Sequence, residues 1–310
     1  MSLALLTALL LSATISSVDS FNVDKAIRYN ERESTKIYFN LPARCERDYE
    51  AEKWTGLTDE PQMRCISKGH GTAKVLLIGN SYGYRTFPVL HKLFDGRYAE
   101  FRLFTKSSRM FLNEDPLDPV YFDYSKLAKL LIEKSKPDIV FVIEKDMDAA
   151  QNEAFSGLIE DDHIFNFTQT RINFLSEHAG SVVIDDQYYK PRLASGIAAT
   201  IARRLRNGQT SRSDFKDLRI EREEYQDEFK FGLRRLNAYK GDNVIKNRVE
   251  DHICRHEHCY FFNKHNLHAY YGDLALHQTT EMLKKLKPGY KRIIKHFLKQ
   301  HKSKVTRDQL

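Results

Sequence analysis

Residues 74–83 read KVLLIGNSYG, and this stretch decides the fold class. It opens with a short, continuous apolar run that ends in Gly79, which is typical of a strand buried on both faces of a parallel sheet. Beyond it, Phe87, Leu90 and Phe94 recur at helical spacing, so we expect a strand, a tight turn and a helix. Ser81 therefore stands at the carboxyl end of a buried strand, directly before a helix.

Further apolar runs alternate with helical patterns along the chain. We predict strands at 101–104, 139–143 and 181–185, and helices at 121–133, 161–178 and 192–206. Strands that alternate with helices favour βαβ units and a parallel sheet that is covered on both faces. The fold class that we expect is α/β, a three-layer α/β/α sandwich of flavodoxin-like type with a mainly parallel sheet.

The regions before and after these units have a different character. Residues 21–70 are polar and irregular, so we interpret them as a cysteine-bearing lead-in and assign residues 71–310 to the α/β domain. The charged stretch 211–240, with its interleaved aromatic residues, is typical of a solvated amphipathic helix. A lid or a membrane-surface helix is the alternative, although mixed charge signs favour the first interpretation. We also predict a short strand at 259–262 and terminal helices at 273–287 and 289–300.

The composition narrows the class of protein. The chain has 310 residues, of which 41% are hydrophobic, so wholesale disorder is excluded. Its formal net charge of +7 is dispersed, apart from lysines that gather in the last helices, and it therefore predicts no nucleic-acid partner. We interpret the basic end as solvated or membrane-facing. No pattern in the sequence indicates a cofactor.

Residues 1–20 are interpreted as a signal peptide. Their apolar run, followed by small and polar residues, has the length of the hydrophobic part of a secretory signal and is short for a membrane span. The alternatives are a residual membrane anchor, left from a transmembrane helix, and an artefact of the start site. We expect entry into the secretory pathway and an extracellular or lumenal location. Asn166, in the sequon Asn166-Phe167-Thr168, is then a candidate glycosylation site.

The four cysteines form two groups, Cys45 with Cys65 and Cys254 with Cys259. In an oxidising compartment this grouping predicts two local disulfides. A zinc site is the alternative near the second pair, because histidines surround it. The cysteines of each pair are spaced too widely for the usual Cys-x2-Cys knuckle, so we favour disulfides over a metal. The surrounding histidines are His252, His256 and His258.

Ser81 is well placed for nucleophilic attack, because ligands bind at the carboxyl edge of open α/β sheets. Such a serine needs a base, and the base needs a partner that fixes its tautomer. Asp273 and His277 lie four residues apart near the end of the chain, close enough for the carboxylate to meet the imidazole. The alternative is that Ser81 merely caps its helix and that His277 is an ordinary core or surface histidine.

Together these features resemble the SGNH (GDSL-like) hydrolase superfamily, with Gly79-Asn80-Ser81 after a buried strand and an Asp/His pair before the last helix. More narrowly, residues from about 40 to 295 resemble the extracytoplasmic SGNH domain fused C-terminally to family-3 membrane acyltransferases. The stretches that carry this narrower resemblance are Ile78-Gly79-Asn80-Ser81-Tyr82, Lys136-Pro137-Asp138-Ile139, Ile184-Asp185-Asp186-Gln187-Tyr188 and Phe261-Phe262-Asn263-Lys264, with Cys45 and His277.

The resemblance implies a Ser–His–Asp enzyme that hydrolyses esters or transfers O-acyl groups, often to carbohydrate. Ser81 would attack the acyl carbonyl, His277 would take and return the proton, and Asp273 would orient His277. The backbone N–H of Ser81 would be one oxyanion donor. The partners implied are an acyl ester or carbohydrate substrate and a membrane or membrane acyltransferase.

The chain departs from the family pattern in three places. Asp273 lies four residues before His277 instead of three. The oxyanion glycine expected after the second strand has no match, and Ser107 or Ser108 stands there instead. The Asn expected after the third strand is replaced by Glu144, whose charge would oppose a developing oxyanion. These departures keep open an alternative function, a catalytically weak or inactive SGNH-fold binding or accessory domain.

Overall fold

The computed structural model describes residues 22–36, 44–112, 124–145, 152–186, 188 and 196–308. The segment 1–20, for which we predict a signal peptide or membrane anchor, lies outside them. Among the described residues, no helix has the length and apolar character needed to cross a membrane.

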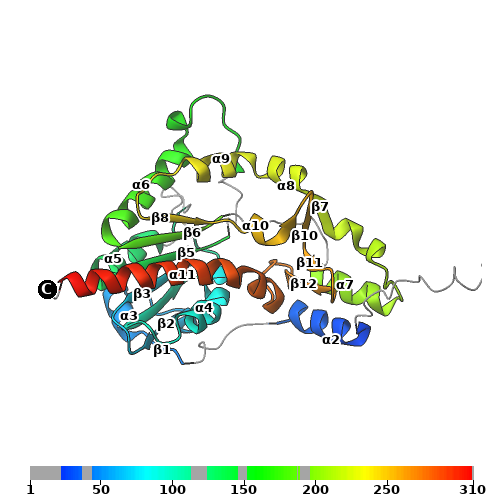
Figure 1. The fold of residues 1–310 in the computed structure, drawn as a ribbon, viewed down its shortest axis with the longest axis horizontal. Coiled ribbons are helices and arrows are strands. Elements are labelled where there is room, and N and C mark those ends of the chain that lie inside the picture. Colours follow the sequence, from blue (N-terminus) through cyan, green and yellow to red (C-terminus); the bar gives the residue numbers. More distant parts are fainter. Residues whose placement is uncertain are drawn as a thin grey trace, which may run out of the picture.

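A seven-stranded mixed sheet forms the centre of the fold (Figure 1). Its strands are β1 (Glu46–Arg47), β2 (Arg64–Lys68), β3 (Lys74–Gly79), β4 (Glu100–Thr105), β5 (Ile139–Ile143), β6 (Ser181–Asp185) and β8 (Val244–Asn247). Parallel pairing joins neighbours in the order β4-β3-β5-β6-β8. Beyond β4, the sheet continues with β2, which pairs antiparallel with β4, and with β1, which pairs antiparallel with β2. All four apolar runs that the sequence singled out as buried strands lie in the parallel part.

Helices cover both faces of the sheet, because alternate side chains of a strand point to opposite faces. The covering helices include α4 (Ser81–Phe94), α5 (Tyr124–Ser135), α6 (His163–His178) and α11 (Thr280–Asp308). Leu77 of β3 packs in one hydrophobic core with residues of α4 and α11, whereas Leu76 and Ile78 pack in a second core with residues of α5 and α6. The three-layer α/β/α sandwich expected from the sequence is confirmed.

The prediction that residues 21–70 are irregular is wrong for the part of them that the structure describes. This segment contains α2 (Val23–Ser34), α3 (Tyr49–Thr55), a short 3-10 helix η1 (Pro61–Met63) and the strands β1 and β2. β2 pairs with β4 along its length, from Arg64 opposite Phe104 to Lys68 opposite Glu100. The sequence of β2, RCISK, is short and mixed in polarity, so it has no apolar pattern that predicts a strand. Backbone hydrogen bonds to the edge of β4 hold it in the sheet.

The charged stretch 211–240 is divided and does not form one amphipathic helix. It comprises the 3-10 helix η4 (Arg212–Leu218), β7 (Arg219–Glu221), α8 (Arg222–Glu228) and α9 (Lys230–Ala238). β7 pairs with β10 (His258–Tyr260), which also pairs with β9 (Cys254–Arg255), and this pairing interrupts the helix. Of the aromatic residues near and within this stretch, Phe215 and Tyr225 are buried in the core, which explains why they interleave with charges.

The strand predicted at 259–262 is split between β10 and β11 (Phe262–Asn263), which pairs with β12 (His268–Ala269). The two small sheets lie to one side of the main sheet, together with α2 and α7 (Ile197–Arg206) (Figure 1). The remaining described elements are η3 (Ile159–Asp161) and α10 (Glu250–Ile253).

The first terminal helix predicted from the sequence begins later than expected. Residues 273–279 form a loop, and one helix, α11, follows as far as Asp308 in place of two. Tyr271 pairs with Gln278 across the loop, and Leu276 has a positive φ of 60°, so the chain turns back on itself where a helix was expected.

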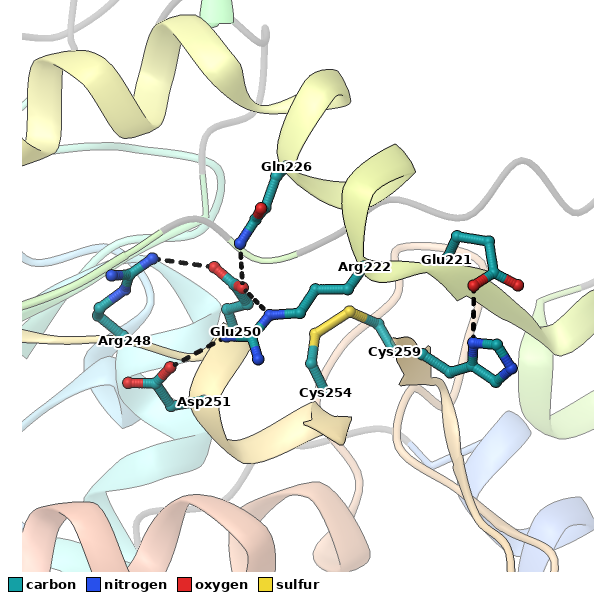
Figure 2. Close-up of a disulfide and its surroundings, with 9 residues drawn as sticks. Glu221, Arg222, Gln226, Arg248, Glu250, Asp251, Cys254 and Cys259 are labelled. Carbon is teal, nitrogen blue, oxygen red and sulfur yellow. Dashed lines mark hydrogen bonds and ion pairs between the residues drawn. A yellow bond between two sulfur atoms is a disulfide. The ribbon is translucent and has the colours of Figure 1, made fainter. Parts of the chain in front are cut away.

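Both predicted disulfides are confirmed. Cys45 bonds to Cys65 with their Cα atoms 5.5 Å apart, and Cys254 bonds to Cys259 with a Cα separation of 3.8 Å. The second bond joins register partners of β9 and β10, beside the buried carboxylate of Glu250 and its ion pair with Arg222 (Figure 2). Since both sulfur atoms of that pair are bonded to each other, the zinc alternative is wrong.

Candidate active site

The end of β3 has a conformation that glycine adopts without strain. Gly79 has φ of 137°, and a Cβ at this position would lie 2.0 Å from the carbonyl oxygen of Ile143. Asn80 then caps α4, because its Oδ1 accepts a hydrogen bond from the Tyr82 N–H at 3.1 Å. The Nδ2 of Asn80 donates to the carbonyl of Lys145 at 2.9 Å. The turn from strand to helix is thereby fixed to the end of the neighbouring strand β5.

Ser81 is the first residue of α4, and its hydroxyl is not needed as a cap because Asn80 supplies one. The Oγ of Ser81 lies 2.7 Å from Nε2 of His277. On the other side of the ring, Nδ1 of His277 lies 2.7 Å from Oδ2 of Asp273. The three side chains that the sequence singled out as nucleophile, base and orienting acid thus form one continuous series of hydrogen bonds.

The extra residue between Asp273 and His277 is accommodated by the loop that carries them. The Leu276 N–H donates to the carbonyl of Asp273 at 3.0 Å, and the Gly272 N–H donates to the carbonyl of His277 at 2.9 Å. The left-handed conformation of Leu276 turns the chain, so that the His277 N–H also donates to Oδ1 of Asp273 at 3.1 Å. A spacing of four therefore still brings carboxylate and imidazole together. We call residues 271–279 the triad loop.

Arg85 is a site residue that the sequence analysis missed. It is nearly buried, and its Nη2 donates to Oδ2 of Asp273 at 3.1 Å. Burial by itself raises the pKa of Asp273, but the hydrogen bonds and charge of His277, together with the charge of Arg85, outweigh burial and lower that pKa to about 2. Asp273 is therefore ionised at neutral pH. One pattern in the sequence could have indicated Arg85 as a site residue: it follows Ser81 by four residues, so both lie on the same face of the helix.

Two further side chains attach the triad loop to the sheet edge. The hydroxyl of Tyr82, directly after Ser81, donates to the carbonyl of Leu276. The ammonium group of Lys145, at the end of β5, donates to the carbonyl of Ala275 at 3.2 Å. Both donors are buried, so the loop is positioned by the same two strand ends that position Ser81.

Glu144 does not take the position expected from the sequence. Its two carboxylate oxygens accept hydrogen bonds from the backbone N–H groups of Phe111 at 2.6 Å and Leu112 at 2.9 Å. It is also not among the described residues that line the cleft beside Ser81. The carboxylate of Glu144 thus holds the segment after β4, and the expectation that its charge opposes an oxyanion stays a prediction.

A cleft of about 340 Å³ opens beside the three side chains. Both oxyanion candidates, Ser107 and Ser108, line it together with Ser81. The backbone N–H of Ser107 already donates to the carboxylate of Glu60 at 3.1 Å, while Ser108 has a left-handed φ of 57°. The remaining lining residues are Lys36, Glu60, Gln62, Met63, Tyr82, Tyr84, Arg85, Asp273, Ala275 and His277.

The other residues considered as sites lie apart from this cleft. Asn166 is exposed in the first turn of α6, and its Nδ2 donates to the carbonyl of Glu160 at 2.7 Å. Glycosylation of Asn166 stays a prediction. Within the part of the chain that the structure describes, no three His, Cys, Asp or Glu side chains gather closely enough to hold a metal ion.

Comparison with known proteins gives one family and distant structural relatives. The model of a family described as "SGNH domain (fused to AT3 domains)" matches residues 44–292. The periplasmic domain of a lipopolysaccharide acetyltransferase from Salmonella ser. Paratyphi A shares 13% identity at a TM-score of 0.50, covering 91% of this chain and 98% of that domain. An acetylxylan esterase from Geobacillus stearothermophilus, solved as a catalytic mutant, shares 10% identity at a TM-score of 0.38, with coverages of 73% and 96%. A search of the curated proteins finds no matching sequence.

Proposed function

The chain belongs to the family of SGNH domains that are fused to AT3 domains, and we propose that it is a serine-dependent esterase or O-acyltransferase. The observation that carries the proposal is the hydrogen-bonded series Ser81, His277 and Asp273 at the carboxyl ends of the parallel strands of the main sheet. A serine, a base and a group that orients the base are what acyl transfer through a covalent intermediate requires.

In the first half of the reaction, Ser81 Oγ attacks the carbonyl carbon of an acyl ester, and Nε2 of His277 takes the hydroxyl proton. Asp273 stays ionised, since its pKa is lowered to about 2, and it stabilises the imidazolium through Nδ1. The tetrahedral intermediate collapses when His277 returns the proton to the leaving alcohol. The products of this half are the free alcohol and an ester on Ser81.

In the second half, water or a hydroxyl of an acceptor attacks the ester on Ser81, with His277 as base. Water gives an esterase, and an acceptor hydroxyl, such as one on a carbohydrate, gives an O-acyltransferase. The backbone N–H of Ser81 lies in the first turn of α4, where N–H groups have no partner inside the helix, so it can donate to the oxyanion. Ser107 or Ser108 would supply the second donor.

The proposed setting is an extracellular or lumenal compartment. Two disulfides support it, because such bonds persist in oxidising environments and are rare in reducing ones. Fusion to AT3 domains elsewhere in the family supports a membrane acyltransferase as partner, which would deliver acyl groups to Ser81.

The test is Ser81→Ala against Ser303→Ala, a matched control at an exposed serine of α11. We expect wild type and the control to hydrolyse p-nitrophenyl acetate and to react with a fluorophosphonate probe. Ser81→Ala is expected to lose labelling and at least about 10⁴-fold of the turnover. Equal labelling of Ser81→Ala and wild type would overturn the proposal.

A second candidate function is a binding or accessory domain with weak or no catalysis. The hydrogen bond from the Ser107 N–H to Glu60 favours it, because that N–H is then not free for an oxyanion. Loss of one oxyanion donor typically costs about 10²- to 10³-fold in rate. Folded wild-type protein that shows neither turnover nor labelling would support this second function over the first.

A further inference from the structure

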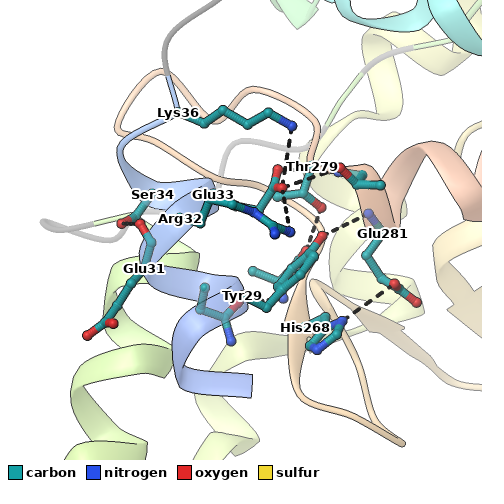
Figure 3. A network of polar contacts seen from close by, with 12 residues as sticks. Tyr29, Glu31, Arg32, Glu33, Ser34, Lys36, His268, Thr279 and Glu281 are labelled. Carbon is teal, nitrogen blue, oxygen red and sulfur yellow. Dashed lines mark hydrogen bonds and ion pairs between the residues drawn. The ribbon is translucent and has the colours of Figure 1, made fainter. Parts of the chain in front are cut away.

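The helix α2 lies before the range matched by the family model, yet it contacts the segment that carries the triad loop. It packs beside α7 and β12, far in sequence from both (Figure 1). Its inward side chains meet residues 267–281, which run from just before β12 to the first turn of α11 (Figure 3). This contact joins segments far apart in the chain, since Asn30 and Leu267 are separated by 237 positions.

The flank before the triad loop is held by Asn30. This side chain is fully buried, and its Nδ2 donates to the carbonyl of Leu267 at 2.8 Å. Its Oδ1 accepts from the N–H of Ala269 at 2.9 Å. The side-chain amide of Asn30 therefore bonds to one carbonyl and one N–H of this segment, as the backbone of a neighbouring strand would. Only an amide side chain has both a donor and an acceptor in this arrangement.

The flank after the triad loop is held through the N-terminus of α11. The first N–H groups of a helix have no partner inside it, and negative charge there is favourable. The carboxylate of Glu33 accepts from Thr280 through both its N–H at 3.4 Å and its hydroxyl at 3.3 Å. The hydroxyl of Tyr29 accepts from the N–H of Glu281 at 2.9 Å. α2 thus accepts from two of the first N–H groups of α11, next to Thr279, whose Oγ1 accepts from the Met282 N–H at 3.3 Å.

The triad loop itself packs on the backbone of α2. A Cβ on Gly272, the residue before Asp273, would lie 2.4 Å from the carbonyl oxygen of Glu33, so only glycine permits this approach. Glu33 is 1% exposed and also pairs with Lys36 at 3.5 Å. Lys36 lines the cleft beside Ser81. The same helix therefore reaches the loop before, within and after the residues that hold His277.

We propose that three residues of α2, Tyr29, Asn30 and Glu33, are positioning residues of the active site, which fix the triad loop so that Asp273 and His277 meet Ser81. The inference rests on the proposed function. Glu33 is its central positioning residue, because its carboxylate accepts from Thr280 at the start of α11 and its carbonyl lies against Gly272. A displacement of about 1 Å at a catalytic group can cost up to about 10²-fold in rate.

The test compares Glu33→Gln with Glu31→Gln in the full chain. Glu31 is on the same helix, but its carboxylate faces outward and pairs with Arg206. We expect Glu33→Gln to lower kcat by about tenfold to a hundredfold with KM nearly unchanged, and Glu31→Gln to match wild type. Fluorophosphonate labelling of Ser81 should slow in parallel with kcat.

A double-mutant cycle with Asp273→Asn separates positioning from general destabilisation. If Glu33 acts through the Asp273–His277 pair, Glu33→Gln should change the rate less than about twofold once Asp273 is already replaced. A merely structural effect would persist in that background and would overturn the inference.

Tyr29→Phe is a milder second variant, in case Glu33→Gln does not fold. It removes one hydroxyl and keeps the ring stacked on His268, and it should lower kcat by about threefold to tenfold. If Ser81→Ala is inactive while Glu33→Gln and Tyr29→Phe both equal Glu31→Gln, the inference fails and the proposed function stands. If Ser81→Ala equals wild type, the proposed function itself fails.

Discussion

Two aspartates at the carboxyl edge of the main sheet have opposite electrostatics. Asp273, 25% exposed, faces His277 and Arg85, and its pKa is lowered to about 2. Asp185, at the end of β6, is 7% exposed, and burial raises its pKa to about 6 although neutral donors partly offset the effect. Those donors are the hydroxyls of Tyr188 and Tyr290 and the side-chain amide of Asn247.

The difference shows that the partners of a carboxylate decide its pKa at a sheet edge more than its place in the fold does. Neutral hydrogen bonds do not compensate the desolvation of Asp185, whereas the hydrogen bonds and charge of His277, together with the charge of Arg85, do compensate that of Asp273. A carboxylate that orients a base and stabilises its protonated form has to be ionised at the working pH. The predictions below test whether the two aspartates differ in function as they differ in pKa.

Asp273→Asn is expected to have the largest effect. An amide at this position no longer stabilises the imidazolium and favours the wrong tautomer of His277, so kcat should fall by about 10⁴-fold. Asp185→Asn is the matched control, since it makes the same chemical change at the same edge, and it should stay within about threefold of wild type. Steady-state hydrolysis of p-nitrophenyl acetate measures both. Equal losses in the two variants would contradict the distinction.

The two aspartates should also give opposite slopes of stability against pH. The folded protein binds the Asp185 proton more tightly than the unfolded chain, whose pKa is near 3.8, so its contribution is complete below about pH 4 and is lost as pH rises through 6. The free energy of unfolding of wild type relative to Asp185→Asn should therefore fall by about 2 kcal/mol from pH 4 to 7. For Asp273, whose pKa is lowered, the contribution is present above pH 4 and is lost as pH falls towards 2.

Urea unfolding of wild type, Asp185→Asn and Asp273→Asn at several pH values measures these differences. Curves for wild type and Asp185→Asn that stay parallel between pH 4 and 7 would show that Asp185 has an ordinary pKa, and the comparison would then lose its electrostatic basis.

Arg85→Gln is expected to lower activity less than Asp273→Asn does. It removes one charge and one hydrogen bond from Asp273 while His277 remains, so kcat/KM at neutral pH should fall by about tenfold to a hundredfold. Arg97→Gln is the control, because Arg97 is exposed and lies beyond the other end of α4. Activity equal to that of the control would mean that His277 alone holds Asp273 in place.

Several features of the fold could be predicted from short stretches of sequence. The apolar run before Ser81 predicts a buried strand, because a short strand that is buried on both faces of a sheet consists of consecutive apolar residues. β5 and β6 were found in the same way. By contrast, β2 and β7 have mixed sequences, and only the strands opposite them, β4 and β10, give them their structure.

The residues of the candidate site also divide into those that the sequence predicted and those that only the folded structure identified. The sequence singled out Ser81, Asp273 and His277 through their combination and its resemblance to a known family, and it singled out the two cysteine pairs through their grouping along the chain. The sequence left open whether Ser81 caps its helix. In the folded chain, the side chain of Asn80 is the cap, because it accepts a hydrogen bond from the Tyr82 N–H. Arg85, Lys145 and the helix α2 act through contacts between segments far apart in the chain. Such contacts form only when the sheet and its layers bring those segments together, which is why the tertiary structure alone decided how the triad loop is held.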